Sequence, residues 1–477
     1  MWFAPKVLIE YCMPRHPYKF IGGVYFYFNV VNPVILSKLL YMKYFKSFFA
    51  IALIFAFSYC TDNTANKTET KEEKADSSNV ATAEQVSGGI TLPSGFSASV
   101  FADNLGKARH IIVNSNGDVY TKIDRDLNDG RGILRLRDTN NDGVAEDISG
   151  FGNYTGTGIE IRNGYLYATS DEKVYRYKLN ANNEPDPASE ELIVTGLVSK
   201  RQHSSKPIAL DNAGNIYVNI GAPSNACQEK DRTKDSKGQD PCPILETAGG
   251  IWQFKADQKN QSYKEGVRYV TGIRNIMALD WNNEMNELYA VQHGRDDLNR
   301  LYPETYSEEE SVELPAEEMF ILKKGSDFGW PYCYYDQRQK KKLLSPEYGG
   351  DKSATGRCEG KGKPIYAFPA HWAPNDLIFY TGTQFPEKYR NGAFVAWHGS
   401  WNRAPREQQG YFVTFLPFKN GMPSGDYEVF ADGFAGTNKT PQGATYRPCG
   451  LAMAPDGSLF ICDDQKGRIW KVTYKAQ

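Results

Sequence analysis

The sequence predicts an all-β protein, a six-bladed β-propeller with long inter-blade insertions. The main observation is a motif that recurs six times: an alternating apolar strand, a turn with Asn or Asp and usually Gly, and a strand rich in Tyr or Phe. The first three copies start about 48 residues apart, which leaves room for a four-stranded blade. The composition, with 43 Gly, 30 Tyr and 25 Phe, also favours short strands over a helical bundle. A β-sandwich with similar hairpins is the alternative.

Each of the six copies has the form of a hairpin. They read ARHIIVNSNGDVYTK from Ala108, GTGIEIRNGYLYAT from Gly156, SKPIALDNAGNIYVNIG from Ser205, RNIMALDWNNEMNELYAV from Arg274, NDLIFYTGTQFPEKYRNGAFVAW from Asn375 and RPCGLAMAPDGSLFICD from Arg447. The gaps between the later copies widen, which places insertions near residues 300–370 and 402–445. No stretch shows the strand–helix alternation of a doubly wound fold.

The charge balance limits the classes of partner. The chain has 55 Lys and Arg residues against 57 Asp and Glu, a net charge of −2. Because no global basic field exists, we expect no nucleic-acid partner. The mean hydropathy of −0.55 excludes a polytopic membrane protein.

The first 89 residues are predicted to lie outside the fold. A start at Met42 opens a lipoprotein-type signal peptide over residues 42–60, because two lysines precede an apolar run too short to span a bilayer. Cys60 is then the lipidated residue, or cleavage is ordinary and Cys60 is incidental. Residues 1–41 are interpreted as a gene-model extension, with a membrane anchor as the alternative. Residues 61–89 lack bulky apolar side chains and are predicted to be a disordered linker.

The propeller is therefore predicted over residues 90–477. The signal peptide and Cys60 predict an exported protein, periplasmic or at the cell surface, on a bacterial outer membrane. Contact with the membrane would be through the lipid anchor only.

A short acidic turn is a possible structural calcium site. Asp138, Asn140 and Asp142 place oxygen ligands at alternate positions before Gly143, as in the first half of a calcium loop. No Glu stands at the twelfth position, so the loop is not a complete EF-hand. A solvated Asx-rich turn is the alternative.

Six of the eight cysteines lie in the predicted propeller. Their order along the chain suggests three local disulfides, Cys227–Cys242, Cys333–Cys358 and Cys449–Cys462, which suit an exported protein. The last pair lies on the two strands of one hairpin. No C-x₂-C pairing occurs, which disfavours a zinc site.

Four cationic or titratable residues stand at equivalent places in the repeat. Arg109, His203, Arg274 and Arg447 each lie 8 to 12 residues before a hairpin turn. In a propeller such positions converge at one end of the central channel. Converging guanidinium groups would suit an anionic, polycarboxylate ligand. A histidine beside them could act as a base near neutral pH.

Several runs resemble the sorbosone/glucose dehydrogenase family, including the pyranose dehydrogenases. They are HSSKPIALDNAGNIYVNIGAPSNAC, GIRNIMALDW, FGWPYC, FYTGTQFPEKYRNGAFVAWHGSWNR and YRPCGLAMAPDG, and the resemblance covers about residues 92–474. Family members are six-bladed propellers that use pyrroloquinoline quinone (PQQ). The resemblance therefore implies PQQ and Ca²⁺ as cofactors.

The resemblance also implies roles for individual residues. His203 matches the general base that takes the proton of the substrate hydroxyl. Arg274 and Asn275 match the residues that bind the quinone oxygens and stabilise charge there. Arg447 matches an arginine that pairs with a cofactor carboxylate. Arg109 joins this cofactor-binding set only because of its place in the ring.

Two further segments carry implied site residues. His398, Trp401 and Arg403 in the WHGSWNR run resemble cofactor-pocket residues, although the soluble glucose dehydrogenases carry a lysine near His398. Gly294 and Arg295 occupy the stretch whose backbone carbonyls hold the catalytic Ca²⁺ in the glucose branch.

These matches predict a quinoprotein that oxidises a sugar or a related alcohol or aldehyde. Gln202 precedes His203 where the glucose branch has an acid, so the choice of sugar does not carry over. No C-x-x-C-H haem motif occurs, so we expect an external electron acceptor, a cytochrome or a quinone. The rival functions are a Ca²⁺-dependent lactonase and a non-catalytic binding propeller.

Overall fold

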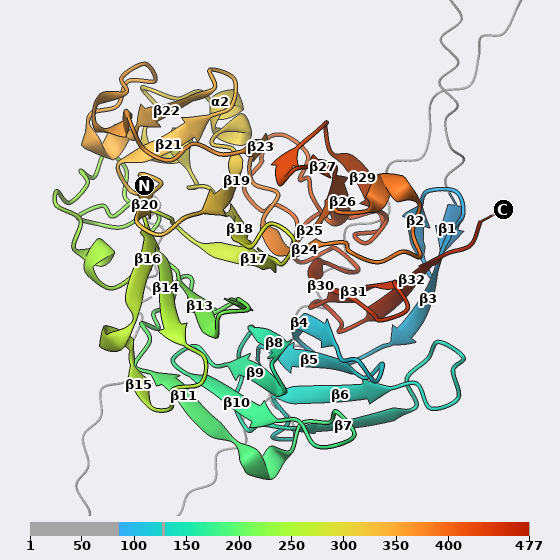
Figure 1. The fold of residues 1–477 in the computed structure, drawn as a ribbon. Helices are drawn as coiled ribbons and strands as arrows, with labels where there is room; N and C mark the ends of the chain where they lie inside the picture. The colour runs from blue at the N-terminus through green and yellow to red at the C-terminus, as the bar shows by residue number, and fades with distance from the viewer. Residues whose placement is uncertain (1–84, 126–128, 477) are drawn as a thin grey trace, which may run out of the picture. The chain divides into compact units, whose positions relative to one another are not determined.

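Six sheets of mainly antiparallel strands are arranged as the blades of a propeller, which confirms the predicted fold class (Figure 1). Their innermost strands are the first strands of the six predicted hairpins. These are β4 (Ala108–Val113), β8 (Ile159–Arg162), β12 (Ile208–Leu210), β17 (Ile276–Asn282), β24 (Pro374–Phe379) and β30 (Pro448–Met453). Each contacts the next around the ring, and β30 contacts β4, so the ring is closed.

The remaining strands complete the blades outward from the channel. Blade 1 adds β5 (Val119–Ile123), β6 (Ile133–Arg137) and β7 (Asp147–Phe151) to β4. Blade 2 adds β9 (Tyr165–Thr169), β10 (Val174–Lys178), β11 (Glu191–Thr195) and the edge strand β15 (Gln261–Ser262) to β8. Blade 3 adds β13 (Asn215–Ile220), β14 (Gly250–Lys255), β16 (Val267–Thr271) and the edge strand β20 (Ser326–Asp327) to β12.

The second half of the ring follows the same plan. Blade 4 adds β18 (Glu287–Gln292), β19 (Glu317–Leu322) and β23 (Tyr366–Phe368) to β17. Blade 5 adds β25 (Ala393–Trp397), β26 (Phe412–Leu416) and β29 (Glu428–Ala431) to β24. Blade 6 adds β31 (Leu459–Asp463), β32 (Ile469–Tyr474) and β3 (Phe96–Ala102) to β30.

Blade 6 joins the two ends of the propeller. Its outer strand β3 pairs with β32 from Phe96 opposite Tyr474 to Ala102 opposite Ile469. Phe96 also packs edge-on against Phe385 and Phe430 of blade 5. Because burying one aromatic side chain contributes about 1.5–3 kcal/mol, this cluster stabilises the closure.

The computed structural model describes residues 85–125 and 129–476. The gene-model extension, the signal peptide, Cys60 and residues 61–84 of the predicted linker lie outside the described residues. The end of the predicted linker is wrong, because β1 (Gln85–Ser87) already pairs with β2 (Ile90–Leu92). Backbone pairing at the edge of a sheet needs no apolar pattern, so composition did not reveal it. Among the described residues no helix is both long and apolar enough to cross a membrane.

The predicted insertion after β18 forms a small layer beside blades 3 and 4. It contains α1 (Leu298–Leu301), α2 (Glu308–Glu313) and the hairpin of β21 (Cys333–Asp336) and β22 (Lys341–Leu344). A second hairpin, β27 (Phe418–Lys419) with β28 (Met422–Pro423), extends blade 5. The 3₁₀ turns are Pro187–Ser189, Pro243–Glu246, Tyr263–Glu265, Pro346–Tyr348, Gly356–Cys358 and Glu387–Tyr389.

Two of the three predicted disulfides are present, Cys227–Cys242 and Cys333–Cys358. The prediction for Cys449 and Cys462 is wrong, because both are buried free thiols. A β-bulge in the β30–β31 pair places Gly450 rather than Cys449 opposite Cys462. The Cys449 Sγ instead lies 3.4 Å from the carbonyl oxygen of Ala108 in blade 1.

Candidate active site

The four predicted ring residues lie at one end of the central channel, where the inner strands begin. Arg109 is the second residue of β4, Arg447 directly precedes β30, and Arg274 lies two residues before the first residue of β17. His203 lies on the segment that leads into β12. Their charges act on one another: Arg274 lowers the pKa of His203, and Arg109 contributes to lowering the pKa of Arg447. The starts of the inner strands thus bring residues of neighbouring blades together in two pairs.

His203 is held in one tautomer. Its Nδ1 lies 2.5 Å from the carbonyl oxygen of Ala222, which can only accept, so Nδ1 carries the proton. Its Nε2 has no hydrogen-bond partner among the described residues and is left with a free lone pair. Burial and the charge of Arg274 lower the pKa of His203 to about 3, so the ring is neutral. Its φ of +56° places the residue in the left-handed region.

Gly221 lies directly against this histidine. A Cβ at position 221 would lie 2.5 Å from Asn275 Oδ1 and 2.7 Å from His203 Cβ. The absence of a side chain here therefore allows His203 and Asn275 to approach each other.

Replacing Gly221 with alanine is expected to displace both side chains. Overpacking of this kind costs about 1–3 kcal/mol, and a displaced base loses rate steeply, so we expect turnover to fall at least about tenfold. Steady-state dye reduction and a thermal melt measure the two effects. Gly425→Ala is the control, since its Cβ would meet only Pro417 Cγ at 3.2 Å. Equal turnover in the two variants would contradict the prediction.

Arg274 and Asn275 are both almost completely buried. Arg274 donates from Nη1 to the carbonyl oxygen of Gly294 at 2.9 Å and from Nη2 to Asp296 Oδ2 at 2.7 Å. Asn275 accepts from Asn219 Nδ2 at 3.1 Å. These partners hold both side chains in place beside His203.

A second group links Arg109 and His398 through Asp464, and Arg447 joins it through the backbone of His398 and Gly399. Arg109 Nη1 donates to Asp464 Oδ2 at 2.6 Å, and His398 Nε2 donates to Asp464 Oδ1 at 2.7 Å. Burial lowers the pKa of His398 to about 4 although Asp464 opposes the shift, so this ring is neutral as well. Arg447 donates to the carbonyl oxygens of His398 and Gly399 at 2.8 and 2.9 Å.

The other residues of the WHGSWNR run have different surroundings. Trp401 is 54% exposed, and the Arg232 guanidinium carbon lies 6.0 Å from its ring centroid. Arg403 is buried and donates to the carbonyl oxygens of Val312 and Ala370, while its Nη2 pairs with Glu313 of α2 at 2.8 Å. These contacts of Arg403 anchor the insertion.

Gly294 and Arg295 do not form a cation site in this arrangement. The Gly294 carbonyl oxygen accepts from the Arg274 guanidinium, which would repel a Ca²⁺ ion at the same oxygen. The Arg295 side chain turns into the insertion and pairs with Glu347. The predicted catalytic Ca²⁺ therefore does not fit these two residues as they stand.

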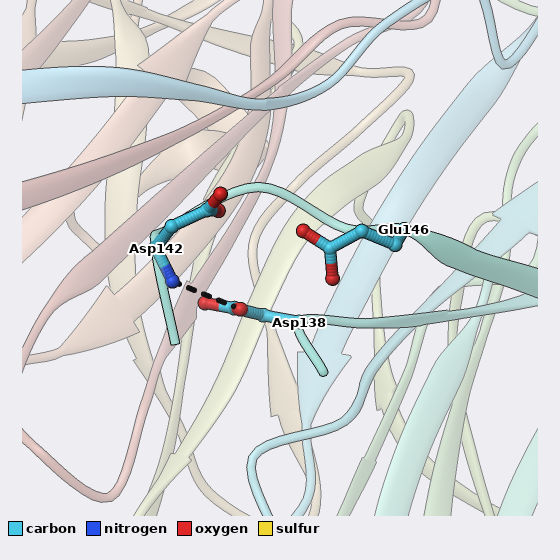
Figure 2. Close-up of side chains that lie close together, drawn as sticks. All are labelled: Asp138, Asp142 and Glu146. Atoms are coloured by element: carbon cyan, nitrogen blue, oxygen red, sulfur yellow. Dashed lines mark hydrogen bonds between the residues drawn. The ribbon is translucent and has the colours of Figure 1, made fainter. Parts of the chain in front are cut away.

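The loop after β6 brings together a different possible calcium site. Figure 2 shows Asp138, Asp142 and Glu146 on this loop, with oxygen atoms within 4.8 Å of one another. Asn140 hydrogen-bonds to Asp142 through both its oxygen and its nitrogen. Glu146 was missed because it follows Gly143 and falls outside the alternating Asp/Asn pattern.

The comparisons with known proteins agree with this fold. A family model described as TrAA12-like matches residues 90–475. The chain belongs to the TrAA12-like family. An uncharacterized protein of Borreliella burgdorferi is 26% identical over 410 residues, which cover 82% of this chain and 93% of that protein.

Relatives of the family include a PQQ-dependent pyranose dehydrogenase of Coprinopsis cinerea. It is 24% identical over 279 residues, 49% of this chain and 36% of that longer protein. The holo form of its PQQ domain superposes with a TM-score of 0.64 at 18% identity, covering 80% of this chain and 97% of that domain. An iodide structure of a Trichoderma reesei AA12 protein gives a TM-score of 0.66 at 20% identity, covering 82% and 99%.

PQQ, an anionic quinone, fits the residues of this TrAA12-like site. Arg109, Arg274 and Arg447 lie at the start of the inner strands of blades 1, 4 and 6, and in the part of the chain that the structure describes the buried Nε atoms of Arg109 and Arg274 have no hydrogen-bond partner. Guanidinium groups with unused donors suit a ligand that carries carboxylates and quinone oxygens.

Sequence reasoning missed the acidic residues of the site. Asp296 binds the two guanidinium groups of Arg274 and Arg232, the latter from a disulfide-closed loop, and Asp464 binds Arg109 and the neutral His398. Asp464 directly follows β31 of the last repeat hairpin. This position was the one feature of the sequence that could have indicated Asp464 as a site residue. Asp296 and Arg232 lie in insertions and have no equivalent in the other blades.

Proposed function

We propose that this chain is a PQQ-dependent dehydrogenase that oxidises a sugar or a related alcohol or aldehyde. The observation that carries the proposal is the neutral His203, with a free Nε2, beside a buried cluster of guanidinium groups. The family and the pyranose dehydrogenase relatives support it.

In this proposal Arg109, Arg274, Asn275 and Arg447 hold the cofactor. When bound, PQQ supplies the two-electron acceptor that takes the hydride from the substrate carbon. His203 Nε2 accepts the proton of the substrate hydroxyl, and its Nδ1–H remains on the Ala222 carbonyl oxygen. The Arg274 guanidinium and the Asn275 amide stabilise negative charge that develops beside them. Electrons then leave to an external acceptor, which we propose to be a cytochrome or a quinone.

Reconstitution tests the proposal. The purified protein is titrated with PQQ, with and without Ca²⁺, and dye reduction is followed over a panel of aldoses, ketoses and sugar alcohols. We expect PQQ binding and reduction with at least one substrate class. Binding of glycans without PQQ binding would favour the non-catalytic propeller, and lactone hydrolysis would favour the lactonase.

The proposed location is periplasmic or at the cell surface, with the protein anchored to a bacterial outer membrane through lipidation of Cys60. Detergent-phase partitioning of the expressed protein, compared with a Cys60→Ala variant, tests this part separately. A wild type that stays in the aqueous phase would contradict it.

We also propose that the loop of Asp138, Asp142 and Glu146 binds a structural Ca²⁺. Ca²⁺ at 100 times its Kd should stabilise the fold by about 2.7 kcal/mol, and a chelator should reverse this. Thermal melts of the apo protein measure the effect without PQQ. Asp142→Asn should abolish the Ca²⁺-dependent shift, whereas Asp351→Asn, in an exposed turn elsewhere, should retain it. A melt that is insensitive to Ca²⁺ would contradict the assignment.

A further inference from the structure

Asp296 lies at the meeting point of three segments that are distant in sequence. Its Oδ2 accepts from Arg274 Nη2 and from Arg232 Nη2, each at 2.7 Å. Its Oδ1 accepts from Asn402 Nδ2 at 2.9 Å. One carboxylate thus joins the start of blade 4, the loop closed by Cys227–Cys242 and the segment after β25.

The backbone of Asp296 is fixed as firmly as its side chain. Its N–H donates to Asn225 Oδ1 at 2.9 Å, and its carbonyl oxygen accepts from Asn225 Nδ2 at 3.0 Å. Asn225 is itself held by Trp330, whose Nε1 donates to the Asn225 carbonyl oxygen at 3.0 Å. This double contact leaves the Asp296 carboxylate little freedom to follow a moving partner.

The Asp296 carboxylate is the shared counter-charge of the Arg274 and Arg232 guanidinium groups. Burial disfavours the charge of Arg274, which is 3% exposed, and Arg232 repels it, whereas Asp296 favours it. Burial alone would raise the pKa of Asp296, but Arg274 and Arg232 hold it well below its usual range. Asp296 is therefore ionised at any working pH. Without it, two guanidinium groups would be left facing each other with no shared counter-charge.

Asp296 also connects the buried Arg274 to a part of the site that is exposed to solvent at Trp401. Arg232 extends from it toward the exposed Trp401, and Asn402 lies between Asp296 and His371, with 3.3 Å from its Nδ2 to His371 Nδ1. A change in the Asp296 carboxylate would thus affect both the buried Arg274 and the pair of Arg232 and Asn402.

We infer that Asp296 is the positioning residue of this site. It fixes the Arg274 guanidinium, with its unused Nε, for the oxygens of the bound quinone, and it keeps Arg232 and Asn402 aligned with that guanidinium. The role in turnover rests on the proposed function. The pairing of Asp296 with Arg274 does not rest on the proposed function, because this pair is present without a cofactor.

The test compares Asp296→Asn with Asp297→Asn. Both variants remove one negative charge at adjacent positions and both lose a contact to Arg232, but Asp297 Oδ2 binds Arg232 and Arg300 and does not contact Arg274. We expect Asp296→Asn to weaken PQQ binding at least about tenfold and to lower kcat about 100-fold, with KM for the sugar within about threefold. Asp297→Asn should change each quantity less than about threefold. Equal effects in the two variants would overturn the proposal.

A double-mutant cycle on the apo protein separates this inference from the proposed function. If Asp296 and Arg274 act as a pair, the loss in Tm of Asp296→Asn combined with Arg274→Met should be smaller than the sum of the two single losses, because the double variant no longer buries the Arg274 charge without its carboxylate. Additive losses in Tm would overturn the pairing. Recovery in this cycle without PQQ binding by the wild type would leave the pairing standing and reject the proposed enzyme.

Discussion

Replacing His203 with alanine is expected to lower kcat by about 10²–10⁴-fold while PQQ still binds. A positioned base contributes a factor of this size. The guanidinium groups that we propose to hold the cofactor do not depend on His203, because Arg274 is paired with Asp296 and Arg109 with Asp464. Dye reduction and a PQQ titration of the same preparation measure the two properties.

The control for this variant is His110→Gln. His110 lies beside Arg109 on β4, but its Nε2 is used on the Asn375 carbonyl oxygen, a bond that an amide can replace. We expect the control to keep kcat within about threefold. A His203→Ala variant with normal turnover would remove His203 from the proposed mechanism. Loss of PQQ binding in that variant would show that His203 acts on the cofactor instead.

The pH profile gives an independent check on the same residue. Because burial and Arg274 lower the pKa of His203 to about 3, the base is already neutral well below the ordinary histidine pKa of about 6.5. Activity should therefore stay nearly constant from pH 8 down to about pH 6 and fall only at lower pH. A midpoint at 6.5 would indicate a solvated histidine.

The largest stability effect is expected for Glu347→Ala. Glu347 and Arg295 form an ion pair in which the side chains are 0% and 3% exposed. Although burial disfavours the charge on Arg295, Glu347 raises its pKa, so the guanidinium stays charged. Removing the carboxylate leaves that charge buried and unpaired, which costs about 3–5 kcal/mol. Thermal and urea unfolding measure the loss.

The matched control is Glu309→Ala, which breaks the pair with Arg406. Those side chains are 54% and 59% exposed, so we expect a loss below about 1 kcal/mol. Glu347→Ala should also lower activity, because Arg295 lies between Gly294 and Asp296 in the chain. Equal losses of stability in the two variants would show that the buried pair is not an important contact.

The blades could be predicted from the sequence because each repeat hairpin is formed by residues that lie close together in the chain. Each repeat hairpin, such as Ile208–Leu210 with Asn215–Ile220, is formed by its own strand and turn residues, and the structure contains this pairing. Both strands are almost entirely buried, so the structure does not show an exposed face in this hairpin. The pairing of β3 with β32 joins the two ends of the chain, and no local pattern encodes such a contact. The β-bulge that separates Cys449 from Cys462 likewise depends on how neighbouring blades pack.

The sequence by itself determined the six-bladed fold and placed Arg109, His203, Arg274 and Arg447 at one end of the channel, because equivalent repeat positions share a place in space. Only the tertiary structure decided what those side chains are bound to. In the structure Arg274 pairs with Asp296, and Arg403 pairs with Glu313 of α2. A buried charged side chain pairs with the opposite charge that the packing places beside it. The carboxylates of this site come from insertions and from other blades, so the repeat pattern does not predict these pairs.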